Sequence, residues 1–419
     1  MTSLIDAPAS PPSEWAPDGE STAASTRVPA SRWRGPISLA RRGRPLLRPA
    51  TSYLLSRAGL FAAAYLVVPL FPGLRVVRAM GTAFDGRWYL MIAQHGYPAR
   101  LYQEGQGSRW AFFPGFPAAV RAVAAVTRLS LPHAAVLAAF VFGLTSALAI
   151  WLAVREVCGA RLADRAVLLY VFCPTAYVLS LAYTEGLFLT AAAACLFALS
   201  RRYWITAALC ACLAGLTRSA GSAVIVAVLV TTLPAAWRGR AWRPAVAALI
   251  APLGLVAFMA YGWVMVGTPL AFLSAERFWQ GQHFVWFVTP VGAMFAAFRH
   301  GPGGAGFETD VMAGTALLLG FVGLWLMDRL SRGVRTVGGA VANVPASWWA
   351  YTVGALLIAY SAYSTNSILR YAMAAFPLFA VFAWWLPRRF DGAVVGVLAC
   401  VQAALLITAL HPSATSLLS

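Results

Sequence analysis

Few carboxylates are available for chemistry in this sequence, because only 14 of its 419 residues are acidic. Three of the acidic residues that we expect to face outward are candidates for chemistry: Asp85 in TAFDGRWYLMIAQHGYP, Glu185 in SLAYTEGLFL, and Glu276 in GTPLAFLSAERFWQGQHFVW. A carboxylate at the mouth of a membrane cavity can serve as a general base. Two of them also have a structural alternative. Asp85 can cap a helix, and Glu185 can occupy a first helical turn behind Thr184 as the cap.

Two arginines lie at the outward ends of apolar segments, Arg218 in AGLTRSAGSA and Arg370 in STNSILRYAMAAFP. A planar guanidinium binds phosphate through paired, charge-assisted hydrogen bonds. Both residues, together with Tyr371, are therefore candidate phosphate ligands. The alternative for Arg370 is a side chain that snorkels to the membrane interface. That alternative is weaker for Arg218, because its neighbours are small and not basic.

Aromatic residues accompany these candidates. Behind Asp85, an aromatic and apolar face recurs at helical spacing through Trp88, Tyr89 and Ile92, which predicts a helix. Residues 108–123, SRWAFFPGFPAAVRAV, predict a second, amphipathic helix; its alternative role is an interfacial helix on the lipid headgroups. The segment around Glu276 combines aromatics, amides and a carboxylate, which suits sugar recognition and an interfacial belt equally.

The elements that must position these residues are apolar helices. Hydrophobic residues make up 60% of the sequence, charged residues 11%, and the mean hydropathy is +0.70. A soluble domain has about 25% charged residues, so we expect an all-α polytopic membrane protein. The apolar segments lie near 53–73, 133–154, 165–182, 186–200, 205–233, 244–266, 309–327, 348–363, 368–386 and 392–410.

Segment 205–233 is too long for one span, since its helix would extend about 43 Å against a hydrocarbon core of about 30 Å. If it forms a hairpin that turns near Arg218, eight of the later arginines face the cytoplasm and three face outside. A single span reverses these numbers. The positive-inside rule therefore favours the hairpin, about eleven spans and a cytoplasmic N-terminus.

We divide the chain into a disordered cytoplasmic tail (1–50), one transmembrane domain (51–410) and a short C-terminal tail (411–419). The domain includes two extracytoplasmic loops, 74–132 and 267–308, and the first carries the amphipathic helices. All 32 basic residues are Arg, which is typical of a GC-rich bacterial genome and hence of a bacterial plasma membrane protein. The arginines concentrate in short loops, so the net charge of +18 indicates cytoplasmic anchoring and not nucleic-acid binding.

Five short motifs occur in the order FDGRWYLMIAQHGY, FFPGFP, YTEGLF, LTRSAG and LRYAMAAFPLF. With them, most of residues 53–390 resembles the PIG-V family of mannosyltransferases, which are integral-membrane glycosyltransferases of the GT-C type. The resemblance implies a GT-C-type transmembrane helical bundle and an inverting transfer from a polyprenyl-phosphate-mannose donor on the extracytoplasmic face. It also implies that Asp85 is the base. In a bacterium, an envelope lipoglycan is the acceptor that we expect.

The residue inventory fits such a reaction. A lipid phosphate is already a good leaving group, so one base and cations that hold the phosphate can suffice. A glycosidase, in contrast, needs two carboxylates. We assign the base to Asp85 and the donor phosphate to Arg218, Arg370 and Tyr371. The acceptor and sugar contacts are assigned to Trp88, Tyr89, His95, Trp110, Glu185, Glu276 and Gln280.

The sequence contains no Gly-rich phosphate loop, and neither its six Cys nor its five His have metal-ligand spacing, so we expect no metal and no cofactor. The expected partners are a polyprenyl-phosphate sugar donor, a lipid-linked glycan acceptor and membrane lipids. Two other functions stay open. One is a flippase or transporter of a lipid-linked sugar, and the other is a non-catalytic scaffold. The concentration of polar residues in outward loops favours the enzyme over the transporter.

Overall fold

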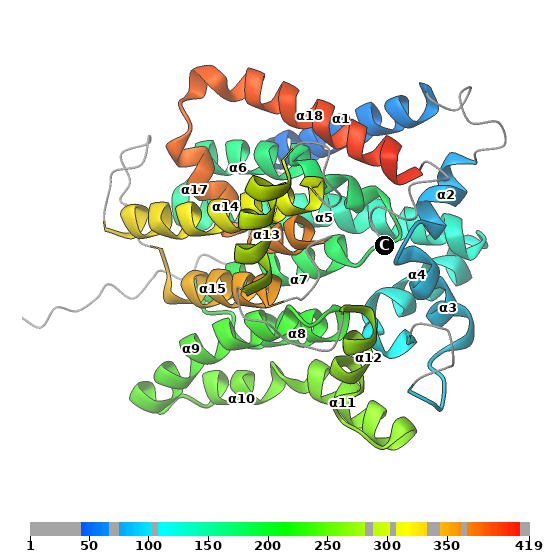
Figure 1. The fold of residues 1–419 in the computed structure, drawn as a ribbon. Coiled ribbons are helices and arrows are strands. Elements are labelled where there is room, and N and C mark those ends of the chain that lie inside the picture. Colours follow the sequence, from blue (N-terminus) through cyan, green and yellow to red (C-terminus); the bar gives the residue numbers. More distant parts are fainter. Residues whose placement is uncertain are drawn as a thin grey trace, which may run out of the picture. The chain divides into compact units, whose positions relative to one another are not determined.

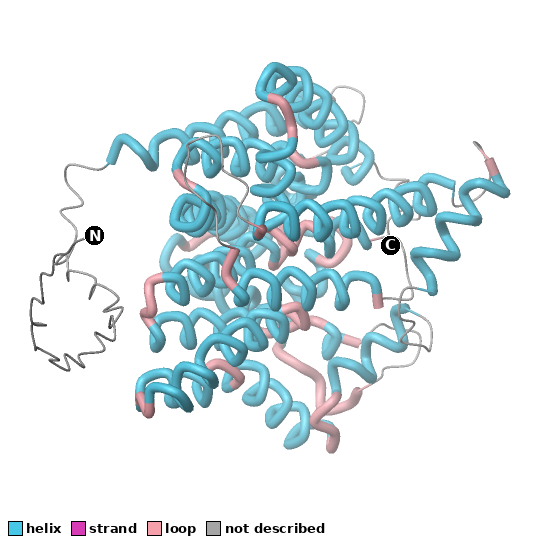
Figure 2. The backbone as a smooth tube through the Cα atoms, turned by 90° about the vertical axis from the view of Figure 1, so that its left-hand side faces the viewer, coloured by secondary structure: helices cyan, strands magenta, loops and turns pink. Residues whose placement is uncertain are grey.

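A computed structural model describes residues 43–66, 75–101, 108–280, 288–301, 307–332, 344–361 and 367–410. Across these ranges the regular elements are helices and none is a strand, so the all-α prediction is confirmed for them (Figure 2). The chain divides into Met1–Gly43 and Arg44–Ser419, and the helices lie in the second unit apart from the first residue of α1.

The helices follow one another along the chain, and Figure 1 labels most of them. They are α1 (Gly43–Leu66), α2 (Val76–Thr82), α3 (Gly86–His95), η3 (Arg109–Ala111), α4 (Gly115–Thr127), α5 (Leu131–Cys158), α6 (Ala160–Phe172), η4 (Pro174–Ser180), α7 (Glu185–Ser200), α8 (Trp204–Thr217), α9 (Gly221–Gly239), α10 (Trp242–Ile250), α11 (Leu253–Val266), α12 (Ala271–Gln280), α13 (Val288–His300), α14 (Phe307–Ser331), α15 (Ala346–Tyr360), α16 (Ile368–Ala372), α17 (Pro377–Trp385), η5 (Arg388–Phe390) and α18 (Asp391–Leu410).

The start of α1 corrects the predicted tail. Residues 1–42 lie outside the described ranges, but 43–50 are helical, although the sequence analysis included them in a disordered segment. Pro45 falls in the first turn, where a missing N–H costs no helical hydrogen bond. Pro49 lies inside the helix, and the Ser52 hydroxyl donates to the Arg48 carbonyl beside it at 2.9 Å. The predicted C-terminal tail, 411–419, is also outside the described ranges.

Five helical stretches of the described ranges are long and apolar enough to cross a membrane: Leu131–Cys158, Gly221–Gly239, Trp242–Val266, Phe307–Ser331 and Arg388–Leu410. The pair α6 and η4 makes a sixth if it counts as one span. This number of apolar helices indicates a multi-pass membrane protein. The predicted number of about eleven spans also included shorter apolar helices such as α7 and α8, and this number stays a prediction.

Prolines break two of the segments that the sequence analysis treated as single spans. Segment 165–182 bends by 78° between α6 and η4, where Pro174 begins the 3-10 helix. Segment 368–386 consists of the five-residue α16 and the nine-residue α17, which Pro377 begins. In both cases proline starts a new helix because it cannot continue the preceding one.

The predicted break near Arg218 is confirmed. Helix α8 ends at Thr217, Arg218 has an extended backbone, and α9 begins at Gly221 and packs against α8 (Figure 1). The turn is tight, since a side chain on Gly221 would come within 2.4 Å of the Ala214 carbonyl oxygen. The chain reverses at this point, and Arg218 lies at the turn.

A buried arginine stabilises the bend between α6 and η4. Arg57 of α1 is only 1% exposed, and its guanidinium donates to the Ala176 carbonyl at 2.7 Å and to the Val171 carbonyl at 3.0 Å. The Gln402 amide of α18 donates to the carbonyls of Val171 and Cys173. Carbonyl groups freed at a helix break need such partners in a membrane, so α1 and α18 together satisfy the bend.

Helix α7 lies at the centre of the packing. It contacts α5, α8, α9 and α15, and most of its side chains are buried. Its first residue, Glu185, is acidic but only 2% exposed. Small residues line these contacts, as is usual where membrane helices approach closely.

The first loop contains α2, α3, η3 and α4. The helix predicted after Asp85 is confirmed as α3, and its Trp88, Tyr89 and Ile92 are buried. The single amphipathic helix predicted for 108–123 is wrong in its extent. The 3-10 helix η3 ends at Ala111, and α4 begins only at Gly115. Pro114 separates the two, because the residue before a proline is disfavoured in the α conformation.

Candidate active site

Four charged side chains that are far apart in the sequence meet in one cluster. Arg370 donates from Nη1 to Oδ2 of Asp85 at 2.7 Å, and its Nε lies 3.6 Å from Oε1 of Glu185. Arg218 donates from Nη1 to the same Oε1 of Glu185 at 2.9 Å. Two carboxylates and two guanidiniums balance in charge. We call Asp85, Glu185, Arg218 and Arg370 the charge cluster.

Asp85 stands at the N-cap position of α3 but does not cap the helix. Its side chain makes no capping hydrogen bond, and its carboxylate binds Arg370 instead. The preceding residue, Phe84, has a φ of 45°, in the left-handed region that side chains other than glycine rarely adopt. The Asp85 backbone N–H donates to the Tyr183 hydroxyl at 3.4 Å. The strained turn therefore directs the carboxylate toward Arg370 and away from the helix end.

A glycine follows each acidic residue of the cluster and lets its backbone approach a neighbour. A side chain on Gly86 would come within 2.8 Å of the Gly81 carbonyl oxygen. A side chain on Gly186 would come within 2.8 Å of the Gly143 backbone nitrogen in α5. Such distances are shorter than real side chains tolerate, so these close approaches fix where Asp85 and Glu185 begin their helices.

Glu185 lies in the first turn of α7, as predicted, but Thr184 makes no side-chain capping bond. The side chain of Glu185 is 3% exposed, whereas that of Asp85 is 30% exposed. Two buried atoms of the cluster, Oε2 of Glu185 and Nε of Arg370, have no hydrogen-bond partner among the described residues. Buried polar atoms are normally hydrogen-bonded, so unpaired ones mark a place where a ligand or water can bind.

Aromatic rings hold both guanidiniums. Arg370 lies over the rings of Tyr183 and Tyr371, at 4.8 and 5.0 Å from their centroids. Arg218 lies over the rings of Phe188 and of the same Tyr371, at 5.6 and 5.4 Å from their centroids. The Tyr371 hydroxyl also accepts from Nη2 of Arg370 at 3.2 Å. Contacts of this kind are worth about 0.5–2 kcal/mol each, and both cations contact the Tyr371 ring.

The residues assigned to the acceptor or sugar fall into three groups, and the first consists of Trp88 and Tyr89 of α3. Tyr89 is buried against the rings of Phe112 and Phe116, and Trp88 stacks on Phe112. Burial raises the pKa of the Tyr89 phenol, and the charges of Asp85 and Glu185 add to this rise. Tyr89 is therefore a neutral phenol near the charge cluster.

Glu276 of α12 forms the second group. It is half-buried, and burial raises its pKa to about 7, while the positive charge of Arg218 opposes this rise. The pKa of Glu276 thus depends on the charge of Arg218, and its carboxyl group gains or loses a proton near neutral pH. Gln280 ends the same helix, but its side chain is outside the described part of the structure.

Trp110 and His95 form the third group, which the structure does not bring to the cluster. Trp110 is 0% exposed, packs against Tyr97 and Phe258, and donates from Nε1 to the Pro98 carbonyl at 3.1 Å. A fully buried ring has no free face for a sugar, so Trp110 supports the loop in this structure. His95 is exposed in the last turn of α3.

Two kinds of residue near the charge cluster were not predicted from the sequence. Tyr183 and Phe188 hold the guanidiniums, and Gly86 and Gly186 allow the close approaches. The pairs Asp85-Gly86 and Glu185-Gly186 were visible as a repeated acid-glycine sequence that could have indicated backbone contacts. In the described ranges, no three side chains of His, Cys, Asp and Glu gather as metal ligands would. The expectation of a reaction without metal stays a prediction.

No protein-family model matches the chain, and no curated protein matches it by sequence. Among solved structures, it is similar to the oligosaccharyltransferase of Archaeoglobus fulgidus. The complex with Zn and sulfate has a TM-score of 0.43 and 15% identity over 85% of this chain and 52% of that chain. The form tethered by a disulfide bond to an acceptor peptide with the NVT sequon has a TM-score of 0.45 and 16% identity over 86% and 55%.

The chain therefore spans about half the length of these neighbours. A similarity this distant carries no conclusion about activity, and the resemblance to the PIG-V family stays a prediction.

Proposed function

We propose that the protein is a GT-C-type membrane glycosyltransferase. In this proposal it transfers mannose, with inversion, from polyprenyl-phosphate-mannose to a lipid-linked glycan or lipoglycan on the extracytoplasmic face. One observation carries the proposal: a partly exposed carboxylate, Asp85, lies in contact with a guanidinium that stands beside a second one. A base next to two cations is an arrangement that can suffice for transfer from a lipid phosphate.

The chemical step needs few groups. The acceptor hydroxyl oxygen attacks the anomeric carbon, and the bond from that carbon to the phosphate oxygen breaks. The hydroxyl proton passes to the Asp85 carboxylate, and the electron pair of the broken bond stays on the lipid phosphate. Arg218 and Arg370 stabilise the charge that develops there, and the Tyr371 hydroxyl adds a hydrogen bond.

The sugar and the acceptor would bind beside this centre. Tyr89 and Glu276 are the assigned contacts that feel the charges of the cluster. Trp88 and Gln280 extend this group along α3 and α12. A neutral phenol and carboxylic oxygens suit the hydroxyl groups of a hexose. Glu185, although assigned to the sugar, is engaged by both guanidiniums and is nearly enclosed.

The proposed setting is a bacterial plasma membrane with the N-terminus in the cytoplasm and the charge cluster on the opposite side. The distribution of arginines supports this orientation. Arg48, Arg165 and Arg201 pair with carboxylates away from the cluster, and Arg201 follows the end of α7. Glu185 begins the same helix, whose 16 residues extend about 24 Å. The two charged ends of α7 thus lie roughly a hydrocarbon core apart.

The test is reconstitution of the purified protein in liposomes with polyprenyl-phosphate-mannose and a lipid-extract acceptor. We expect a mannosylated lipid product and released polyprenyl phosphate in equal amounts. Parallel reactions with a glucose and a pentose donor examine the sugar preference. Movement of the donor across the bilayer without a new glycosidic bond would overturn the enzyme and favour a transporter. If the donor neither reacts nor crosses the bilayer, the result would favour a non-catalytic scaffold.

A further inference from the structure

The two carboxylates of the charge cluster differ in access and in partners. Asp85 is 30% exposed and binds Arg370 alone among the described ion pairs. Glu185 is 3% exposed, and its Oε1 contacts both Arg218 and Arg370. One carboxylate is thus an accessible partner of one cation, and the other is an enclosed bridge between two.

A donor phosphodiester creates a conflict at this cluster. It brings one negative charge to a group of side chains whose charges already balance. The guanidinium of Arg370 that would bind the phosphate holds Asp85 at 2.7 Å. The proposed base is therefore bound to the proposed phosphate ligand before the donor arrives, and a carboxylate in an ion pair is a weaker base.

We propose that the donor phosphate replaces Asp85 as the partner of Arg370, while Glu185 stays bound to both guanidiniums as a positioning residue. Asp85 is then released to act as a base only when the donor is in place. This inference rests on the proposed function, because it assumes that the site binds a lipid phosphate.

The surroundings determine which carboxylate leaves. Arg370 is held by the rings of Tyr183 and Tyr371, so its guanidinium keeps its position when one partner changes. The side chain of Asp85 reaches the surface, whereas Glu185 is enclosed at the start of the central helix. The unpaired Nε of Arg370 and Oε2 of Glu185 provide further hydrogen bonds for the phosphate and the sugar. Exchange at Asp85 is the path that disturbs the fewest contacts.

Simple Coulomb attraction makes a different prediction, and binding measurements separate the two. If only net charge matters, neutralising either carboxylate strengthens binding of an anion. If the exchange operates, Asp85→Asn strengthens binding because Arg370 is free, and Glu185→Gln weakens it because the two guanidiniums lose their bridge. The two substitutions then change the affinity in opposite directions, which a general loss of structure cannot produce.

The experiment measures the affinity of the full-length protein in lipid nanodiscs for farnesyl phosphate, which cannot react. We expect about fivefold tighter binding for Asp85→Asn, the size of one partly exposed ion pair. We expect about tenfold weaker binding for Glu185→Gln. Asp391→Asn and Glu156→Gln remove a charge from ion pairs outside the charge cluster and should leave the affinity unchanged. Thermal unfolding of each variant checks its folding.

The outcomes are distinct. Absence of binding by the wild-type protein would overturn the proposed function itself. Wild-type binding that Asp85→Asn does not strengthen, or that both substitutions strengthen equally, would overturn the exchange and leave the function standing. If Glu185→Gln does not fold, a double-mutant cycle decides. The gain from Asp85→Asn should disappear in an Arg370→Gln background, and a gain of unchanged size there would contradict the exchange.

Discussion

Two arginine-aspartate pairs in this protein look almost the same by distance and exposure. Arg370 and Asp85 lie 2.7 Å apart with side chains 13% and 30% exposed, and Arg165 and Asp391 lie 2.6 Å apart with side chains 11% and 32% exposed. They flank α17 in the sequence, since Arg370 precedes this helix and Asp391 follows it. They differ in how many of the hydrogen-bonding groups of each arginine have a partner.

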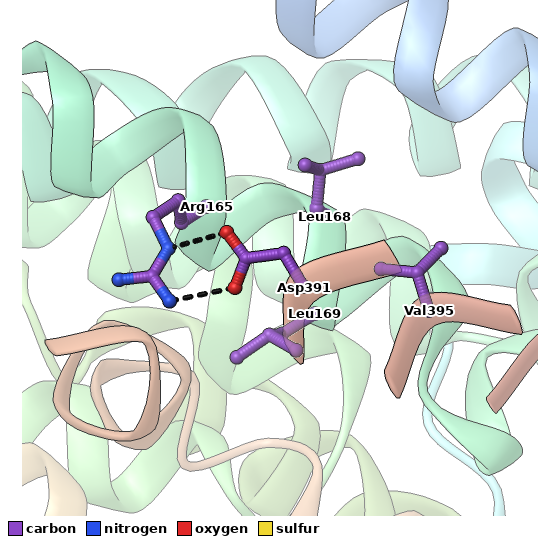
Figure 3. A pocket seen from close by; sticks show the side chains of 5 residues that line it. All are labelled: Arg165, Leu168, Leu169, Asp391 and Val395. Carbon is purple, nitrogen blue, oxygen red and sulfur yellow. Dashed lines mark hydrogen bonds and ion pairs between the residues drawn. The ribbon is translucent and has the colours of Figure 1, made fainter. Parts of the chain in front are cut away.

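The Arg165 guanidinium uses its N–H groups in four hydrogen bonds. It binds both carboxylate oxygens of Asp391 (Figure 3). It also donates to the Ala383 and Leu386 carbonyls at the end of α17. The cavity beside it has a volume of about 10 Å³, lined by Leu168, Leu169 and Val395. That is room for one water at most. This pair fastens α6 to the turn between α17 and α18.

The Arg370 guanidinium, in contrast, is held by rings and by single bonds. It binds only one oxygen of Asp85, and its Nε is buried without a hydrogen-bond partner among the described residues. Distance and exposure therefore do not distinguish the ion pair of the proposed active site from the other pair. The distinguishing property is whether the hydrogen-bonding capacity of the arginine is used up.

The largest expected effect comes from neutralising each aspartate in turn. Asp85→Asn should lower mannose transfer by about 10²–10⁴-fold, because Asn cannot take a proton at neutral pH. Thermal stability should be nearly unchanged. Asp391→Asn should reverse this pattern, with transfer retained and unfolding easier by about 1–3 kcal/mol. Transfer rates and melting curves of both variants provide the measurement. Near-normal transfer by Asp85→Asn would contradict the base assignment.

The next effect comes from replacing each arginine by lysine. Arg370→Lys keeps the charge but loses the planar group between two rings, so transfer should fall about thirtyfold, equivalent to about 2 kcal/mol. Arg165→Lys loses bonds to Ala383 and Leu386, and should cost about 1–2 kcal/mol of stability with little change in transfer. Equal loss of transfer in both variants would mean that the Arg370 pair is also only structural.

A smaller effect separates the glycines that follow the two aspartates. Gly86→Ala places a methyl group within 2.8 Å of the Gly81 carbonyl, so α3 must shift and transfer should fall about tenfold. Gly392→Ala meets nothing within 4 Å and should be neutral or stabilise α18 by up to about 0.5 kcal/mol. Single-turnover rates and melting curves test both. Unaltered transfer by Gly86→Ala would show that the contact does not position Asp85.

The smallest effect is a pH dependence near the charge cluster. Because burial raises the pKa of Glu276 from its ordinary 4.5 to about 7, the folded protein retains a proton that the unfolded chain has lost between these values. The contribution of Glu276 to stability therefore falls as the pH rises through this window and is constant above it. Glu276→Gln should flatten the pH dependence of thermal unfolding between these pH values. An unchanged slope would refute the assignment.

Local patterns in the sequence predicted much of the fold. The spacing of Trp88, Tyr89 and Ile92 predicted α3, and the arginine distribution predicted the turn at Arg218. The patterns failed where one residue outweighs an apolar stretch, as Pro377 does between α16 and α17. Average hydrophobicity does not show such a break, because Pro377 lies among strongly apolar residues.

The site was harder to predict than the fold, since its contacts join distant segments. The role of Asp85 as the base stays a prediction, and its sequence neighbours could not show that it binds Arg370, 285 positions away, instead of capping α3. The assignment of Trp110 as a sugar contact also stays a prediction. The sequence showed an aromatic residue in an outer loop, but it could not show that the ring is buried against Phe258.

The buried Arg57 has a consequence for the order in which the protein is assembled. Its hydrogen-bond partners in the bend between α6 and η4 lie 114 to 123 residues further along the chain. When the ribosome has made α1, none of these partners exists, and a cation alone in lipid is costly. Helix α1 therefore completes its contacts only after synthesis has passed η4. An early contact surface of the chain thus stays incomplete until a much later segment has been made.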